Sequence, residues 1–305
     1  MSSRTYQRLG RSLLADRVAT IVFWSIGVFV VAILGAIIVH FLLASIGTLS
    51  PDFLTSDPSR ERLGGVGPVL WNSFYILVLT MLITVPLGLI GGIYMAEYAG
   101  PGRLANLIRL SQELISSVPS IVVGLFGLAF FVVAFHWNFS AISGAMALAV
   151  FNLPLMTRLS EQALRAVPGG ERDASLALGA TRWQTIRNVV LPLGIPGIVT
   201  GIVLTSGRIY GEAAALIFTA GLSTPSHYDF SNFNLADPTS PWSPFHSATT
   251  LSVYIWKLNS EGLGDFVRQV ADTSSAILVI AVLAFNVGAR GLGRLLQRRV
   301  SGSSS

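Results

Sequence analysis

Two ionisable side chains, Arg208 and Glu212, fall in an otherwise apolar stretch of this 305-residue chain. An arginine at the centre of a membrane-spanning helix costs on the order of 2.5–3.5 kcal/mol, so it is expected to face a bundle interior or a wet cavity. Its guanidinium presents forked donors that match the oxygens of an oxyanion. On a continuous helix Glu212 would lie one turn further on, within pairing distance. Two interpretations stay open: Arg208 lines an anion pathway, or the pair only fixes helix packing.

The other residues that could do chemistry show no catalytic or metal-binding pattern. The chain has no cysteine, which excludes disulfides and thiolate sites. Its only lysine, Lys257, lies in Val-Tyr-Ile-Trp-Lys-Leu-Asn, whereas a P-loop requires Gly-x-x-x-x-Gly-Lys-Ser/Thr. We therefore expect no metal, no cofactor and no ATP hydrolysis by this chain alone. Metal-ligand spacing is also missing among the four histidines, His40, His136, His227 and His246.

The composition predicts a helical membrane protein. Apolar residues make up 52% of the chain and charged residues only 11%. Several stretches approach 20 residues, enough to cross a hydrocarbon core of about 30 Å. The net charge of +5 is better explained by membrane topology than by nucleic acid. We predict an all-α polytopic protein with six membrane-spanning helices, at residues 18–46, 70–96, 118–136, 141–158, 193–220 and 274–292.

The segments between these spans differ in character. Residues 99–117 are expected to form a short amphipathic connector, and residues 248–258 a short interfacial helix within the long polar loop 221–273. Aromatic residues at 242–245 in that loop would either anchor it at the membrane surface or contact a soluble partner. Gly88 and Gly92, in the second span, are small enough to permit close helix packing. Polar tails at 1–17 and 293–305, the loop at 47–69 and a polar loop at 159–192 complete the chain.

The basic residues predict the orientation. Six spans place both tails, the 99–117 connector and the 159–192 loop on one side, which holds fifteen arginines when Arg158 is included. The other side holds four basic residues: Arg60, Arg62, Lys257 and Arg268. Because basic residues concentrate in cytoplasmic segments, we predict that both termini and the 159–192 loop are cytoplasmic and that the 221–273 loop is outside.

The 159–192 loop carries a spaced motif. Two helical patterns, Glu171–Leu178 and Thr181–Val190, flank Gly179, which can adopt positive φ and end the first helix. Pro192 either stops the second helical pattern or opens the next helix at its first turn. The motif consists of Asp173, Ala174 and Ser175, Gly179 after three further residues, Val189 after nine more, and then Leu191 and Pro192.

This spacing resembles the cytoplasmic coupling loop of ABC importer permeases. The family pattern is Glu-Ala-Ala, three residues, Gly, nine residues, Ile, one residue and Leu-Pro, and here Asp, Ser and Val are conservative departures from it. The resemblance implies the MetI-like permease fold of type I importers. It also implies that the motif residues dock a separate ATPase: Asp173, Ala174, Ser175, Gly179, Val189, Leu191 and Pro192.

Three further runs resemble the membrane subunits of phosphate-specific ABC importers. They are Met-Ala-Glu-Tyr-Ala at 95–99, the run at 117–127 and the run at 207–220, where Ala213 and Ala215 replace Thr and Pro. The short N-terminal tail and Arg-Ala-Val-Pro at 165–168 favour the PstA type of subunit over the PstC type. The resemblance covers residues 70–292, so we expect the permease domain there, with the coupling loop at 159–192 inside it.

The resemblance implies a set of partners in a bacterial or archaeal plasma membrane. The chain would form half of a phosphate pore with a homologous PstC-type permease, above PstB-type ATPase subunits, and would receive phosphate from an extracytoplasmic PstS-type binding protein. Arg208 and Glu212 would line the substrate pathway. Two alternatives stay open: a permease for sulfate, molybdate or tungstate, and a secondary transporter, which would need more intramembrane ionisable groups and inverted repeats.

Overall fold

The structure is a computed structural model, and it describes residues 3–58, 64–100, 102–224, 228–237, 239–262 and 265–301. Helices and no strands occur in these ranges. Five helices are long and apolar enough to cross a membrane, and a bent pair of helices makes a sixth span if it is counted as one. The predicted all-α, polytopic fold is therefore confirmed. Arg60, Arg62, His227 and the Ser/Gly end at 302–305 lie outside the described residues.

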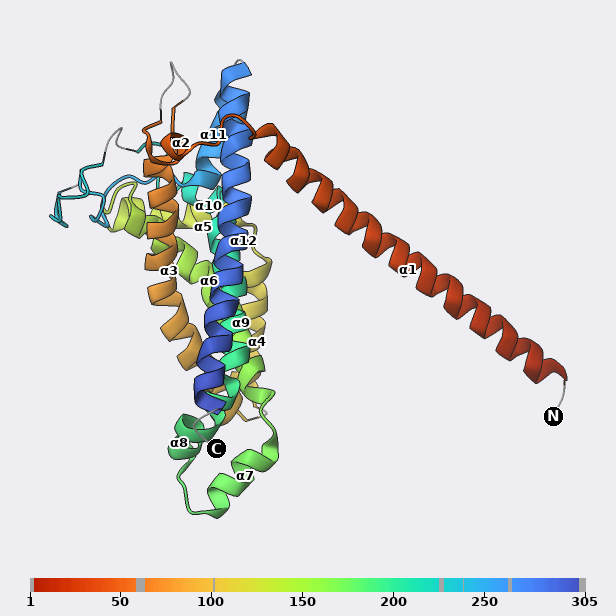
Figure 1. The fold of residues 1–305 in the computed structure, drawn as a ribbon. Helices are drawn as coiled ribbons and strands as arrows, with labels where there is room; N and C mark the ends of the chain where they lie inside the picture. The colour runs from red at the N-terminus through yellow and green to blue at the C-terminus, as the bar shows by residue number, and fades with distance from the viewer. Residues whose placement is uncertain are drawn as a thin grey trace.

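The first span belongs to α1, Ser3–Ala44, which diverges from the helix bundle (Figure 1). The predicted tail and the predicted first span form one helix, since nothing between Ser3 and Ala44 interrupts it. None of the residues in its membrane-length part, Asp16–Ala44, is buried. The short helix α2, Pro51–Thr55, follows and begins at Ser50, whose hydroxyl accepts a hydrogen bond from the Phe53 amide.

The bundle is built around α3, Gly67–Ile93, and α6, Ala141–Arg165. The two helices approach closely, as the small residues predicted. A Cβ added at Gly88 would lie 2.6 Å from Cγ of Met156, and one at Gly92 would collide with Ser160. Such spacing leaves no room for a side chain, so glycine is required at both positions. A π-helical turn, η1, Tyr94–Tyr98, completes the second span.

The third span differs from the prediction. The expected connector is a full helix, α4, Arg103–Ser117, and it is followed by α5, Ser120–Gly127, and the π-helical η2, Leu128–Ala134. The two parts bend by 97° across the break at Val118 and Pro119. The proline explains the bend, because its ring disfavours helical geometry at the preceding residue, and Val118 is extended with ψ 131°. The apolar run at 118–136 is therefore the second arm of a bent pair.

The fifth span is continuous with the second helical part of the coupling loop. That loop contains α7, Gly169–Ala177, then α8, Arg182–Thr185, and the π-helical η3, Ile186–Val190. The fifth span, α9, Leu191–Gly211, follows η3 without a break. Pro192 opens α9 without breaking the helix, because the π turn before it lets the Leu191 amide bond to the Ile186 carbonyl. The helix ends at Gly211, nine residues before the predicted end at 220.

The chain ends in the short α10, Ala214–Ile217, then α11, Leu251–Glu261, and the long α12, Asp265–Ser301. The last span begins earlier than predicted, with its membrane-length part at Val267–Gly288. The predicted interfacial helix at 248–258 corresponds to α11, shifted by three residues. Both termini lie at the same end of the molecule as α7 and α8, and α2 and α11 lie at the opposite end (Figure 1).

Candidate functional site

The turn between α7 and α8 is built around Gly179, whose φ is +87°. The Ala180 amide bonds to the Ser175 carbonyl at 3.3 Å, and the Gly179 amide bonds to the Leu176 carbonyl at 3.0 Å. This pair of bonds is the Schellman motif that ends helices at a left-handed glycine. The predicted helix–glycine–helix elbow is therefore present in the structure.

Side chains on both sides of the elbow fix its geometry. Thr181 and Gln184 form a reciprocal capping box at the start of α8, with bonds of 3.3 Å and 2.8 Å. The hydroxyls of Ser175 and Thr185 lie 3.0 Å apart and connect α7 to α8. Ser175, one of the motif residues, thus holds the two short helices together.

The motif residues divide between a free surface and the bundle. Asp173, Ala174 and Gly179 are exposed on α7 and its end, whereas Val189, Leu191 and Pro192 are partly buried where the chain re-enters the bundle. Leu191 packs beside a buried cluster that includes Met156, Leu164, Val167, Val190 and Ile198. The first group is accessible at the surface, and the second lies where the loop joins α9.

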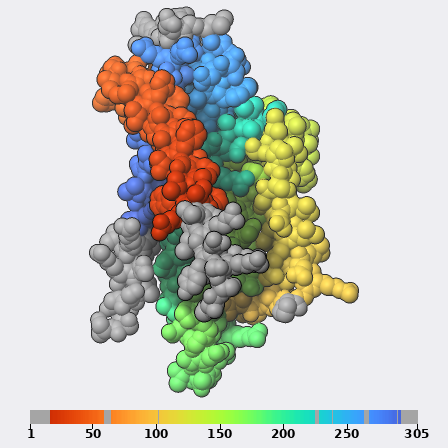
Figure 2. Space-filling view, turned by 90° about the vertical axis from the view of Figure 1, so that its right-hand side faces the viewer, coloured from red at the N-terminus to blue at the C-terminus, as the bar shows by residue number. Residues whose placement is uncertain are grey.

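The coupling loop protrudes from the end of the molecule, seen in green in Figure 2. Its tip carries apolar side chains that the bundle does not cover. Leu178 is 90% exposed, Trp183 is 54% exposed and Leu176 is 43% exposed. An apolar tip rimmed by polar residues is typical of a protein interaction site.

An arginine clamp fixes α7 to the bundle. Nε and Nη2 of Arg172 donate to Oε1 of Glu97 at 3.1 and 2.9 Å, and Nη1 and Nη2 donate to the carbonyls of Val167 and Leu164, each at 2.6 Å. Glu97 belongs to η1, Leu164 to the last turn of α6, and Val167 to the segment just after α6. A charge-assisted contact of this kind is stronger than a neutral one, so α7 is fixed to the ends of the second and fourth spans.

A second charge cluster lies beside the clamp. Glu161 of α6 is 7% exposed, and its Oε1 lies 3.2 Å from Nη2 of Arg109 and 3.0 Å from Nε of Arg165. Arg165 also donates to the Met95 carbonyl at 3.0 Å. The cluster connects α4, α6 and η1 at the coupling-loop end of the bundle.

The structure does not form the expected contact between Arg208 and Glu212. Because α9 ends at Gly211, Glu212 is extended, with ψ 129°, and its Oε1 accepts a bond from the Ala215 amide at 3.4 Å at the start of α10. The guanidinium carbon of Arg208 lies 4.2 Å from the ring centroid of Phe151. In the described ranges Arg208 has no carboxylate partner, so this structure does not contain the ion pair with Glu212. No described helix packs closely on Gly211, since nothing lies within 4 Å of its Cβ position.

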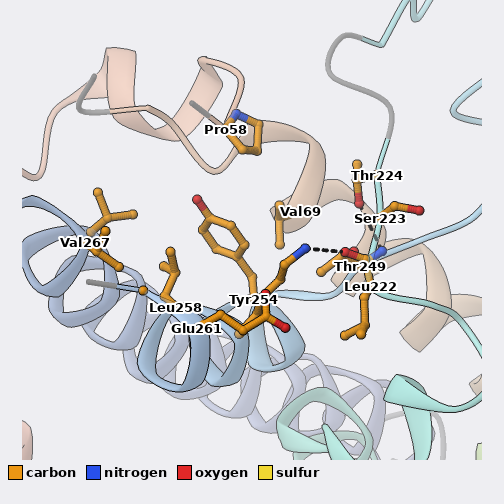
Figure 3. A pocket seen from close by; sticks show the side chains of 13 residues that line it. Pro58, Val69, Leu222, Ser223, Thr224, Thr249, Tyr254, Leu258, Glu261 and Val267 are labelled. Atoms are coloured by element: carbon orange, nitrogen blue, oxygen red, sulfur yellow. Dashed lines mark hydrogen bonds between the residues drawn. The ribbon is translucent and has the colours of Figure 1, made fainter. Parts of the chain in front are cut away.

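A cavity of about 500 Å³ with a mixed polar and apolar lining lies at the opposite end, between α3, α11, the start of α12 and the loop that precedes α11 (Figure 3). Nζ of Lys257 donates to the Leu222 carbonyl at 3.0 Å, and the Thr249 amide donates to the Thr224 hydroxyl at 3.0 Å. Glu261 also lines this cavity, so it carries charges of both signs. In the parts of the chain that the structure describes, no group of His, Asp and Glu side chains could hold a metal ion.

Sequence reasoning missed the arginine clamp and the exposed tip. The sequence suggests that Glu97 pairs with a nearby arginine. The identity of that arginine, Arg172, depends on the position of α7. Leu178 carried a clearer signal, since a leucine directly before the helix-ending glycine of a polar loop has no core to enter.

Comparison with known proteins places this architecture in a family. Residues 88–302 match the family described as binding-protein-dependent transport system inner membrane component. The chain is 45% identical to the probable ABC transporter permease protein YqgI of Bacillus subtilis (strain 168), covering 94% of this chain and 98% of that one. It is 32% identical to the phosphate transport system permease protein PstA of Haemophilus influenzae, covering 83% and 85%.

Solved structures agree on the fold. A bacterial alginate ABC transporter, in complex with an alginate pentasaccharide-bound periplasmic protein, matches with a TM-score of 0.65 at 14% identity and covers 95% of this chain and 99% of that one. The MetNI methionine ABC transporter matches with a TM-score of 0.55 at 22% identity, covering 76% and 94%. This chain thus belongs to the binding-protein-dependent transport system inner membrane components and is a multi-pass permease subunit of an ABC importer.

Proposed function

We propose that this permease is the PstA-type subunit of an ATP-driven importer of inorganic phosphate. Similarity to the phosphate permease PstA of Haemophilus influenzae, which extends over most of both chains, supports phosphate as the substrate. A second phosphate permease, PstA 1 of Mycobacterium tuberculosis (strain H37Rv), is 32% identical over 73% of this chain. The name of the Bacillus subtilis relative carries no substrate. Sulfate, molybdate and tungstate are the competing oxyanions, whereas family membership speaks against a secondary transporter.

The observation that carries the mechanism is the protruding elbow with its uncovered tip. Docking of α7 on a PstB-type ATPase would bury Leu178 and Trp183, which the bundle leaves exposed. Movement of the ATPase would then reach the bundle by two routes. One is the Arg172 clamp to Glu97, and the other is the unbroken helix from Arg182 to Gly211.

The proposed assembly follows from the apolar helix surfaces that this chain leaves exposed. Its exposed apolar helices require a lipid surrounding and a PstC-type second permease, and an external PstS-type protein would deliver phosphate. The membrane is the plasma membrane of a bacterium or archaeon. Both termini and the coupling loop, which share one end of the molecule, face the cytoplasm on the basis of their excess of arginine.

Arg208 is the proposed anion contact in the pathway. It is half-buried, lies three residues before the end of its helix, Leu191–Gly211, and packs on Phe151 rather than on a carboxylate. An arginine without a counter-ion attracts an anion more strongly than a paired one. Glu212, just beyond the helix, is proposed to accept a hydrogen bond from the OH group of hydrogen phosphate, a group that sulfate lacks.

Uptake of radiolabelled phosphate tests the proposal in vesicles that hold both permeases, the ATPase and the binding protein. We expect ATP-dependent uptake that unlabelled phosphate blocks and sulfate or molybdate does not. Arg208→Gln should lower uptake by about tenfold or more, because a hydrogen bond to a charged group is lost. Arg208→Lys should recover only part of it, since lysine keeps the charge without the fork.

Arg268→Gln is the matched control, because Arg268 is exposed at the start of α12. It should keep normal uptake and normal assembly. Glu212→Gln should make uptake more sensitive to sulfate. Equal uptake by Arg208→Gln and Arg268→Gln would remove Arg208 from the pathway, and transport of sulfate or molybdate in place of phosphate would select the competing substrate.

A further inference from the structure

A cavity of about 370 Å³ lies at the coupling-loop end of the bundle, next to the Arg172 clamp. Among the described residues, its lining consists of small residues and three arginines and contains no carboxylate. The small residues come from the end of the second span, and the arginines come from three different helices: Arg109 from α4, Arg165 from α6 and Arg172 from α7.

The carboxylates that accompany these arginines hold the guanidinium groups in place. Glu161 contacts Arg109 and Arg165 through one oxygen, and Glu97 contacts Arg172. Three arginines share two carboxylates, so the cluster keeps a net positive charge. Because each guanidinium is already fixed by a partner, an incoming ligand would not need to order it.

Donors remain available in the cavity. Within the described part of the chain, Nη1 of Arg165 and both Nε and Nη1 of Arg109 have no hydrogen-bond partner. The side chains are 41% exposed for Arg109 and 49% exposed for Arg165, so a ligand can reach them from solvent. Three charged nitrogen donors around one cavity suit an anion that has several oxygens, such as a phosphate group.

We propose that this cavity binds a phosphate group and that the bound group ties α7 to α4 and α6. Arg172 belongs to the coupling helix and Arg109 to α4, so one anion between them would stiffen the base of the coupling loop. The group has two sources, free inorganic phosphate and the headgroup of an anionic lipid, since basic pockets at the ends of membrane helices also hold such headgroups. The site does not depend on which substrate the permease transports.

The test uses the full chain in nanodiscs, without ATPase or binding protein. Hydrogen exchange of residues 169–178 is measured with and without inorganic phosphate, in discs of phosphatidylcholine or of phosphatidylglycerol. In phosphatidylcholine, phosphate should slow this exchange. Arg109→Gln should weaken the effect by about tenfold in concentration. Its loss leaves Glu161 paired with Arg165, so the fold should persist.

Arg103→Gln is the matched control, because Arg103 lies on the same helix but is exposed and does not line the cavity. It should respond to phosphate as the wild type does. If a lipid headgroup occupies the site, phosphatidylglycerol alone will slow exchange in the wild type, and will do so less in Arg109→Gln. The proposal is overturned if neither phosphate nor phosphatidylglycerol slows exchange, or if Arg109→Gln and Arg103→Gln respond alike.

Discussion

The left-handed backbone conformation of Gly179 determines the turn between α7 and α8 in the coupling loop. Its φ of +87° lies where an L side chain is strained, although nothing within 4 Å would obstruct a Cβ. The requirement is therefore conformational and not steric. A residue with a side chain would either bear the strain or move the Leu178 tip away from its place at the end of α7.

Gly179→Val should distort the elbow at a cost of about 1–2 kcal/mol, the penalty of left-handed geometry for an L residue. In the assembled transporter we expect ATP hydrolysis to continue while substrate transported per ATP falls. Gly170→Val is the matched control, since Gly170 lies in α7, has no positive φ and has open space around it. Wild-type coupling in Gly179→Val, at normal abundance in the membrane, would contradict the role given to this turn.

The helix α3 organises the loop that covers the other end of the bundle. Asn72 is fully buried and contacts that loop at four points: its Nδ2 donates to the Thr224 hydroxyl and the Thr249 carbonyl, both at 3.2 Å, and its Oδ1 lies 2.8 Å from the Tyr228 hydroxyl and 3.1 Å from Nε2 of His246. Burial lowers the pKa of His246, against an opposing bond to the Ser243 carbonyl, and raises the pKa of Tyr228. One amide thus holds the loop that includes the predicted aromatic cluster.

Those aromatic residues also pack on α3. Trp242 lies edge-on to Trp71, with ring centroids 4.8 Å apart, and stacks on Phe233 at 5.5 Å. Neither predicted role, membrane anchor or partner contact, includes this packing: Trp242 contacts other aromatic residues of the same chain. Phe245, by contrast, remains 49% exposed.

Asn72→Leu should destabilise this end of the protein by about 1–3 kcal/mol, because it leaves buried polar groups of Tyr228, His246 and Thr249 without a partner. The melting temperature of the purified chain in detergent should fall, and protease should cut the 221–250 loop sooner. Asn286→Leu serves as the comparison, since among the described residues the Asn286 side chain bonds only to the Val282 carbonyl of its own helix. Equal melting temperatures for the two variants would show that the loop is held by other contacts.

The whole molecule is one subunit of a multi-subunit ABC importer. The elbow between α7 and α8 protrudes at one end, and α2 and α11 lie at the other. Helix α1 diverges from the bundle, and its apolar side chains are exposed. Its relatives are permease subunits, which are not enzymes themselves. The chain also has a single lysine, Lys257, which lies in α11 and not in a phosphate-binding loop.

The purified chain alone should therefore show no ATPase activity and no concentrative uptake. Both should appear only when the ATPase subunits and the second permease are added. The informative control is Leu178→Asp, which should leave the isolated chain folded because Leu178 is 90% exposed, but should weaken capture of the ATPase. ATP hydrolysis by the pure chain, or undiminished ATPase capture by Leu178→Asp, would contradict this division of labour.

Features that depend on neighbouring residues in the chain were predictable from sequence. Apolar length located the membrane helices, Gly179 located the elbow, and Gly88 and Gly92 indicated a close helix contact, because each effect acts through local geometry or through the size of a single side chain. Even the bend at Pro119 had a local signal. Its effect on the third span is not predictable from apolar length alone, because a run of span length is compatible with one straight helix or with one arm of a bent pair.

Features that depend on distant segments required the fold. Arg172 pairs with Glu97, which is 75 positions away in the sequence, and Arg109 pairs with Glu161, which is 52 positions away. The end of α9 at Gly211 separates Arg208 from Glu212, although the spacing of four residues alone suits a helical pair. Charges pair with whichever opposite charge the packing brings within a few ångströms, so ion-pair partners are decided by where helices end in space.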